Sequence, residues 1–171
     1  GLRTSSVVRG WAQLDRPVWL DEDVEGGAST DDTLGDLREL TDLWPEAPAM
    51  LATYTSAERA RSLTALSHEA RLARLVALVE RAHPAARGHV VASHVHAWDE
   101  DPWARGAYVW MPCGVLTGAL PALMRPLPPS NRLHFAGDWC SYRPGFMHGA
   151  LDAAERVVGE VLAAASPRPR A

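Results

Sequence analysis

The chain has 171 residues, of which 47% are hydrophobic and 22% are charged, and its formal net charge is −4. This composition supports a folded core and excludes a wholly disordered chain. The weak negative charge, without a run of basic residues, argues against a nucleic-acid-binding surface. No apolar segment reaches the roughly 20 residues that a membrane-spanning helix needs, so we expect no membrane span.

The first third of the chain predicts strands joined by a loop. Residues 5–20 are rich in valine, tryptophan and leucine and predict one or two strands. Residues 21–36 are acidic and contain two adjacent glycines, which is typical of a loop or the tip of a hairpin. Residues 51–55 predict a further short strand.

The middle of the chain predicts a helical segment followed by a strand. Apolar residues recur at helical spacing over residues 56–82, where Ser67 could act as the N-cap of a second helix. His83 and Pro84 end the helical pattern, because proline disfavours a helical residue before it. Residues 89–98 are rich in valine and alternate with histidine, which predicts a strand.

The last third of the chain predicts a long loop, a short strand and a final helix. Residues 99–130 carry six prolines and predict a loop broken by a helical turn near 116–123. Residues 133–136 predict a short buried strand. Residues 149–164 are rich in alanine at helical spacing and predict a helix, and residues 166–171 predict a frayed tail.

Residues 135–162 hold the strongest local arrangement, which predicts a strand, a tight turn with an acid and a helix N-terminus. A helix N-terminus offers unpaired N–H groups and a partial positive charge, which suits phosphate or a group that becomes anionic. An acid at the C-terminal end of a strand, here Asp138, lies where α/β folds bind cofactor hydroxyls. The residues alone leave an ordinary strand–turn–helix open as the alternative.

The same segment resembles a family signature. FAGD at 135–138, followed by GFMHGALDAAERV at 145–157, resembles the C-terminal flavin signature of flavin-containing amine oxidases of the monoamine oxidase/L-amino-acid oxidase type. Further segments match the family in its order and cover nearly all of the chain. They are RPVW at 16–19, GGASTD at 26–31, TYT at 53–55 with ALS at 65–67, and WDEDPWARGAY at 98–108.

The resemblance implies a mixed α/β (α+β) fold that is the C-terminal part of a two-domain FAD-dependent amine oxidoreductase. Residues 1–100 would be part of the substrate-binding domain, and residues 101–171 the closing strand and helix of the FAD-binding domain. The GxGxxG motif that holds the FAD pyrophosphate is absent from this sequence. We therefore expect a subunit or fragment that works with an N-terminal FAD-binding chain or segment of the same enzyme, in an oligomer.

The resemblance assigns cofactor-binding roles to the signature. Asp138, where the family usually has glutamate, would bind the ribityl chain of FAD. Gly137 would allow close approach of the backbone, and Met147 would offer its N–H to the flavin O2 edge. The helix that follows would stabilise negative charge on the flavin. Gly145 and Phe146 complete the expected cofactor-binding set.

The resemblance also implies residues that act on the substrate. Phe146 matches the aromatic side chain that flanks the amine beside the flavin, and Tyr108 its opposite wall, although a one-residue gap would place Ala107 there instead. Arg9 stands where the family usually has a lysine that holds a water near flavin N5; arginine keeps the charge but not the geometry. The cysteine of covalent family members is missing near Gly106, so non-covalent FAD is expected.

The function implied is oxidation of a small-molecule amine, first of all an L-amino acid, to an oxo acid, ammonia and hydrogen peroxide. A polyamine oxidase, an amino-acid 2-monooxygenase of the same fold and a non-catalytic fragment that binds a partner chain remain as alternatives. His94 and His96 share a strand face, but no third ligand supports a metal site. Cys140 has no histidine base placed nearby in the sequence, so we interpret it as a packing residue.

Overall fold

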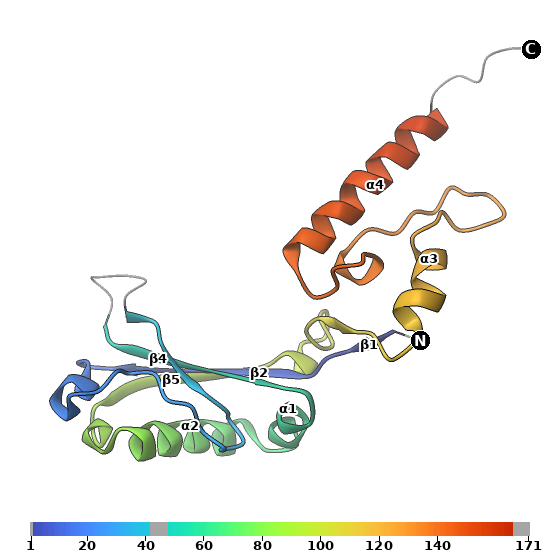
Figure 1. The fold of residues 1–171 in the computed structure, drawn as a ribbon. Coiled ribbons are helices and arrows are strands. Elements are labelled where there is room, and N and C mark those ends of the chain that lie inside the picture. The colour runs from blue at the N-terminus through green and yellow to red at the C-terminus, as the bar shows by residue number, and fades with distance from the viewer. Residues whose placement is uncertain (1, 42–47, 166–171) are drawn as a thin grey trace, which may run out of the picture. The chain divides into compact units, whose positions relative to one another are not determined.

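The computed structural model describes residues 2–41 and 48–165, which form two compact units (Figure 1). One unit is Ser6–Ala107, here the sheet unit; the other joins residues 2–5 to those from Tyr108 onward, here the helix unit. The tail predicted at 166–171 lies outside the described residues. None of the described helices is both long enough and apolar enough to cross a membrane.

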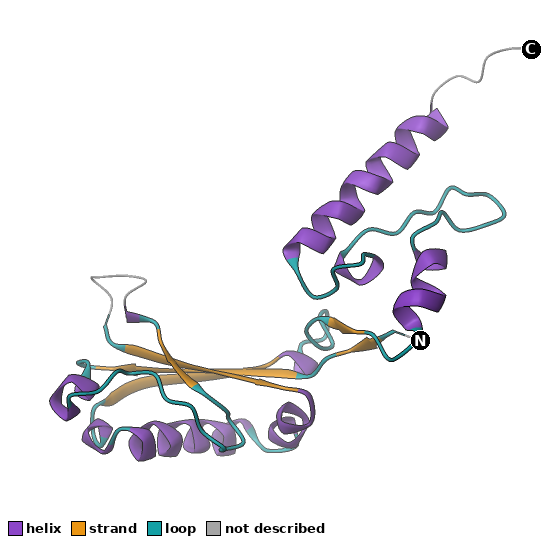
Figure 2. Ribbon diagram, viewed as in Figure 1, coloured by secondary structure: helices purple, strands orange, loops and turns teal. Residues whose placement is uncertain are grey.

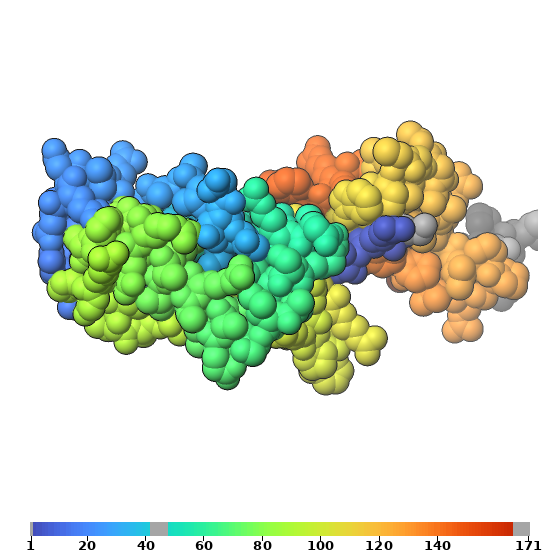
Figure 3. All heavy atoms as spheres, turned by 90° about the horizontal axis from the view of Figure 1, so that it is seen from below, coloured from blue at the N-terminus to red at the C-terminus, as the bar shows by residue number. Residues whose placement is uncertain are grey.

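The sheet unit is a four-stranded antiparallel sheet covered on one face by two helices. Figure 2 shows both helices on the same side of the strands, and Figure 3, viewed from that side, shows them in green over the sheet. The strand order is β3-β4-β2-β5. The elements are β2 (Val7–Leu14), β3 (Leu37–Glu39), β4 (Met50–Ser56), α1 (Ala57–Thr64), α2 (His68–Ala82) and β5 (Val90–Ala97).

The central strand β2 separates the two faces of the sheet. Its side chains alternate between the faces, and Val8, Ala12 and Leu14 are completely buried in the core under the helices. Arg9 and Trp11 point to the opposite face and are only partly buried. Burial of a leucine or valine side chain contributes about 1.5–3 kcal/mol, so the helix-covered face supplies most of the stability of this unit.

The helical segment of the sheet unit divides as its capping residues predict. The Ser67 Oγ accepts a hydrogen bond from the Ala70 N–H at 3.2 Å, so Ser67 is the N-cap of α2. Leu63 from α1 and Leu75 from α2 are completely buried against the sheet. His83 ends α2, as predicted.

Arg71 is a buried cation that joins the two helices to the chain after β5. Its side chain is 3% exposed. It donates hydrogen bonds to the carbonyl oxygens of Leu63 (2.9 Å), Thr64 (3.0 Å) and Leu66 (2.8 Å), and it forms an ion pair with Glu100. The guanidinium thereby supplies a donor to carbonyl groups at the C-terminal end of α1 and in the turn after it, of which the Leu63 carbonyl also accepts the Leu66 N–H.

The helix unit is built around one long helix. Its other elements are short, and Val115–Ala119 has π-helical hydrogen bonding. The elements are β1 (Arg3–Thr4), which pairs with β6 (Val109–Trp110), then α3 (Leu120–Leu123), a 3-10 helix at Asp138–Cys140 and α4 (Met147–Ala165).

Two sequence predictions need correction. The strand predicted at 133–136 is wrong: this segment is irregular, and Leu133 is half exposed. A strand needs a neighbour to pair with its backbone, and none of the described residues supplies one to this segment. Residues 5–20, predicted as one or two strands, contain the single strand β2, and the 3-10 helix Val18–Glu22 follows it. The final helix begins at Met147, two residues earlier than predicted.

Replacement of Arg71 should destabilise the sheet unit. Arg71→Met would remove the donor that the buried guanidinium supplies to the carbonyl oxygens of Leu63, Thr64 and Leu66 and to the Glu100 carboxylate, and we expect a loss of about 2–4 kcal/mol in the free energy of unfolding. Arg74→Met on the exposed side of α2 is the matched control. Urea unfolding followed by circular dichroism measures both; equal effects of the two changes would contradict the role given to Arg71.

The ion pair should also make stability depend on pH. The hydrogen bond from Arg71 lowers the pKa of Glu100 below its usual value near 4.5. Stability from the carboxylate is therefore complete above that usual value and is lost as pH falls through the lower pKa of the folded state. The stability difference between the native chain and Glu100→Gln should shrink on acidification below about pH 5. A difference that stays constant down to pH 3 would contradict the pairing.

Candidate cofactor and substrate site

A glycine turn carries the acidic residue of the signature. Gly137 has φ 144°, and a side chain there would place its Cβ 2.6 Å from Nε1 of Trp139. Only glycine is compatible with this conformation and this close approach. The turn leads directly into the 3-10 helix that starts at Asp138. Because glycine has no side chain, the backbone at Gly137 is open to close approach by another group.

Asp138 closes the loop that follows the turn. Its Oδ2 accepts a hydrogen bond from the Gly145 N–H at 2.8 Å. Gly145 has φ 81°, a left-handed conformation that disfavours other residues. Oδ1 of Asp138 accepts no hydrogen bond from the residues that the structure describes. One carboxylate oxygen thus shapes the loop while the other can accept a hydrogen bond from a hydroxyl group of a ligand.

The N-terminus of α4 lies directly after this loop. The Phe146 carbonyl accepts hydrogen bonds from Gly149 (3.0 Å) and Ala150 (3.3 Å), and the N–H groups at the start of the first turn have no helical acceptor. A Cβ at Gly149 would lie 2.2 Å from the carbonyl oxygen of Arg143, so the loop passes tightly over the helix. Met147 is the first residue of α4, so its N–H is among these groups.

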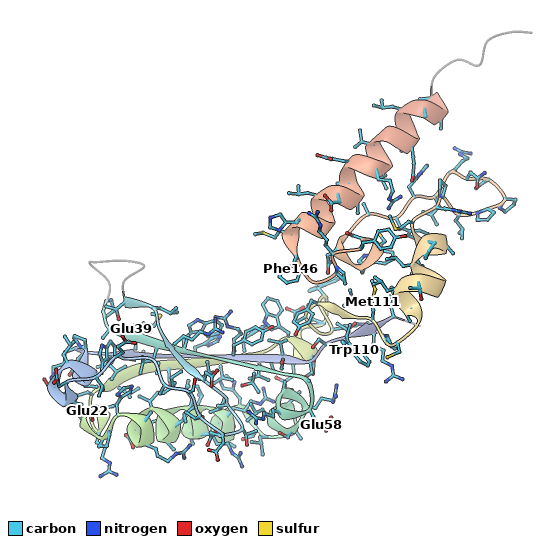
Figure 4. All side chains as sticks on the ribbon, viewed as in Figure 1. Glu22, Glu39, Glu58, Trp110, Met111 and Phe146 are labelled. Atoms are coloured by element: carbon cyan, nitrogen blue, oxygen red, sulfur yellow. The ribbon has the colours of Figure 1, made fainter. Side chains whose placement is uncertain are left out.

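Two aromatic residues of the predicted site lie near this loop. Figure 4 shows Phe146 at the entry to α4, and its side chain is 67% exposed. A Cβ on Gly145 would lie 3.5 Å from the ring of Tyr108, so Tyr108 borders the loop, whereas Ala107 belongs to the sheet unit. An open hollow beside Phe146 is lined by Tyr142, Arg143, Pro144, Phe146 and His148.

Arg156 holds the signature segment against α4, a role that the sequence analysis missed. Its guanidinium donates to the carbonyl oxygens of Met124 (2.7 Å) and Phe135 (2.8 Å) and to Oε1 of Glu160 (2.7 Å). A hydrogen bond from His134 and then the contact with Arg156 lower the pKa of Glu160. The spacing of four residues between Arg156 and Glu160 is the signal that could have indicated the ion pair.

Cys140 is a packing residue, as predicted. It is completely buried, and its thiol lies 3.3 Å from the Phe135 carbonyl oxygen and 3.4 Å from that of Gly137. Burial raises the pKa of the thiol, which disfavours the thiolate that a nucleophile would need. The cysteine therefore supports the turn from beneath.

Arg9 belongs to the sheet unit. It lies opposite Tyr54 on β4 and His96 on β5. Its Cζ atom is 5.4 Å from the ring centres of both Trp11 and Tyr54. The other expected site residues, Tyr108 and those of the signature, all lie in the helix unit.

The geometry of the helix unit fits a cofactor that is both hydroxylated and anionic. A bare glycine backbone, a free carboxylate oxygen and the N–H groups of a helix N-terminus occur within one short segment. Groups of this kind are suited to bind a nucleotide cofactor.

The family follows from comparison with known proteins. The model of the family "flavin containing amine oxidoreductase" matches residues 1–162, and the chain belongs to this family. The family implies a flavin, FAD, as the cofactor, and the residues described above fit it.

Curated relatives agree with this assignment. The chain is 28% identical over 170 residues to amine oxidase [flavin-containing] B of Bos taurus, covering 96% of this chain. It is 29% identical over 156 residues to the flavin-dependent L-tryptophan oxidase RebO of Lentzea aerocolonigenes, covering 86% of this chain. In each case it spans 32% of the relative's length.

Solved structures show the same mixed α/β fold. Cyclohexylamine oxidase from Brevibacterium oxydans superposes with a TM-score of 0.79 at 21% identity, over 96% of this chain and 37% of that chain. A redesigned putrescine oxidase superposes with a TM-score of 0.80 at 20% identity, over 96% of this chain and 36% of that chain. The chain thus has the fold of the C-terminal part of a two-domain FAD-dependent amine oxidoreductase.

Removal of the Asp138 carboxylate should weaken cofactor binding. Asp138→Ala loses the acceptor for Gly145 and the free oxygen, and a charge-assisted hydrogen bond contributes about 1.5–3 kcal/mol, so the Kd for FAD should rise roughly 10- to 100-fold. Titration of FAD into the apoenzyme measures this. Asp152→Ala, a second half-exposed carboxylate of the helix unit, is the control. Unchanged FAD affinity in Asp138→Ala would remove this residue from the site.

Proposed function

We propose that this chain is part of an FAD-dependent enzyme that oxidises a primary amine, first of all an L-amino acid. The products would be an oxo acid, ammonia and hydrogen peroxide. The observation that carries the proposal is the carboxylate of Asp138, fixed by Gly145 at the N-terminus of α4. The likeness to an L-tryptophan oxidase supports an amino acid as the substrate.

The residues of the chain would bind and orient the reactants. When bound, FAD supplies the acceptor for a hydride from the carbon that bears the amine. Asp138 would accept a hydrogen bond from a ribityl hydroxyl of FAD. The N–H of Met147 would stabilise negative charge that develops at the O2 edge of the flavin. Phe146 and Tyr108 would flank the neutral amine and restrict its approach. Without a cysteine near Gly106, the FAD would be held non-covalently.

The enzyme would need a further segment or chain. The GxGxxG motif is absent from this sequence, and the chain spans about a third of the length of its curated relatives. An N-terminal FAD-binding chain or segment would supply the pyrophosphate contacts, and we expect the assembly to be an oligomer. Residues 1–100 would contribute to the substrate-binding domain and residues 101–171 to the FAD-binding domain; the structure itself divides after Ala107.

A simple amine is the second candidate substrate. The identity of 28% with amine oxidase B favours an amine without a carboxylate. Hydrogen peroxide release from the enzyme that contains this chain, measured over a panel of L-amino acids and the corresponding amines, separates the candidates. Oxidation of polyamines would indicate the polyamine oxidase. Formation of an amide product from an amino acid would indicate the monooxygenase. If none of these compounds reduces the flavin, the remaining candidate is a non-catalytic fragment that binds a partner chain.

Truncation of Phe146 should slow flavin reduction. Phe146→Ala would widen the slot between Phe146 and Tyr108 that is proposed to hold the amine beside the flavin. Misplacement of the amine by about 1 Å can cost roughly 100-fold in rate. Anaerobic stopped-flow absorbance measures the reduction rate, with Phe146→Tyr as the variant that keeps the ring.

Thermal melting of the same variants tests the rival explanation that Phe146 only packs under the helix. A buried phenylalanine would cost about 3–5 kcal/mol on truncation. Because the side chain is 67% exposed, we expect little loss of stability. A Phe146→Ala protein that is destabilised but reduces its flavin at the normal rate would contradict the proposal that Phe146 positions the amine.

A further inference from the structure

One histidine of the sheet unit is buried at the end of α2, and the proposed reaction does not use it. His83 is 2% exposed and directly follows the last residue of α2. Its backbone N–H donates to the Val79 carbonyl oxygen at 2.8 Å, and its ring is tilted against the ring of Trp19 with 6.0 Å between ring centres. Side chains buried to this extent have hydrogen-bond partners, and the nature of the partners decides the charge of the ring.

Both ring nitrogens of His83 face acceptors. Nδ1 lies 3.0 Å from Oε2 of Glu22, and Nε2 lies 2.9 Å from the carbonyl oxygen of Gly26. A backbone carbonyl oxygen and an ionised carboxylate accept hydrogen bonds and donate none. A neutral imidazole has one N–H and donates to one of the two, whereas the protonated ring has two N–H groups and donates to both. The geometry therefore requires an imidazolium wherever Glu22 is ionised.

Glu22 is held as a carboxylate in this arrangement. Its Oε1 accepts a hydrogen bond from the Ala85 N–H at 2.8 Å, while its Oε2 faces the His83 ring. The Ala85 N–H, and after it the His83 ring, lower the pKa of the Glu22 carboxyl below its usual value near 4.5. At neutral pH the proton between Glu22 and His83 therefore belongs to the ring.

The surroundings of the ring also favour a positive charge. His83 is the C-cap of α2, where the helix carries a partial negative charge. In the 3-10 helix Val18–Glu22, the loop after it, β3 and the chain around the end of α2, acids outnumber arginines: Asp21, Asp23, Glu25, Glu39 and Glu80 stand beside Arg81 and Arg87. Arg81 is itself paired with Asp32. A buried imidazolium thus has the compensation that a buried charge needs.

The loop that His83 contacts is held on a second side by β3. The Gly26 N–H donates to Oε2 of Glu39 at 3.1 Å, so side chains hold both the N–H and the carbonyl group of this one residue. A Cβ at Gly26 would lie 2.8 Å from this oxygen and 2.8 Å from the ring of Trp19. Figure 4 shows Glu22 and Glu39 at the same end of the sheet unit. Without the donor from His83, Gly26 would be held by Glu39 alone.

We propose that His83 is a pH-sensitive switch: as an imidazolium it holds residues 22–27 against the end of α2, and loss of its ring proton at alkaline pH releases them. The neutral ring would keep one of its two hydrogen bonds and leave the other acceptor without its donor. Histidine is the side chain whose charge ordinarily changes near neutral pH. The stability that the contact contributes is therefore complete in weak acid and is lost as the pH rises through the titration of the ring.

Ring protonation tests the charge directly. In the enzyme that contains this chain, with histidine rings labelled with nitrogen-15, His83 should give two ring N–H signals at about pH 7, identified by their loss in His83→Gln. Glu22→Gln keeps the acceptor for Ala85 and turns an N–H towards Nδ1, so that a neutral ring satisfies both neighbours. The Nδ1–H signal should then disappear. A single ring N–H from His83 in the native protein would overturn the proposal.

Hydrogen exchange of the loop tests the release. We compare amide exchange of residues 22–27 at about pH 6 and about pH 9 by mass spectrometry, after correction for the intrinsic pH dependence of exchange. Protection in the native protein should fall roughly 10-fold or more at the higher pH, because a charge-assisted hydrogen bond is lost. In Glu22→Gln it should change little. His89→Gln is the control and should behave as the native protein does, since His89 pairs with Asp15 at a more exposed position.

Each outcome decides the proposal, and neither readout depends on substrate oxidation. Protection that is independent of pH in the native protein would overturn the release of the loop. An equal loss of protection in the native protein and in Glu22→Gln would assign the pH dependence to a group other than His83 and would also overturn it. If His83→Gln does not fold, the comparison of the native protein with Glu22→Gln still supplies both readouts.

Discussion

Pairing of β2 on both of its edges is the constraint on which the sheet unit depends. The strand is in register with β4 from Val7 to Gln13 and with β5 from Val8 onward. Because strand side chains alternate, the pairing that buries Val8 under the helices also fixes Arg9 on the opposite face. A slip of one residue would exchange the two sets, so the hydrophobic core and the cationic face are specified together.

The helix unit lacks such a sheet and uses charged hydrogen bonds instead. Arg156 joins α4 to the carbonyl oxygens of Met124 and Phe135, and Glu160 joins it to His134. These contacts connect the helix to the segment that ends at Asp138. The position of the Asp138 carboxylate is therefore set by residues in the later turns of α4, away from its N-terminus. A motif search finds the acid and the glycines, but not the side chain that holds them.

Local patterns predicted the elements whose cause is local. Helical spacing and the Ser67 cap gave both helices of the sheet unit, and the FAGD signature gave the glycine turn and its acid. The strand at 133–136 failed because strand formation depends on a neighbour. His96 was interpreted as a polar position on a strand, since its register with Arg9, 87 residues away, cannot be read from spacing. The periodicity of apolar residues in the sequence does not show which distant strands pair with each other.

The two units differ in the amount of apolar surface that each buries for itself. The sheet unit has a continuous core under α1 and α2, whereas the buried apolar residues described in the helix unit are few and scattered: Val115, Leu120, Cys140 and Ala153. α4 exposes Leu151, Val158 and Leu162, and in proteins most of the stability of a helix comes from packing of its apolar face. The sheet unit therefore carries a core of its own, whereas α4 presents exposed apolar side chains against which a further apolar surface can pack.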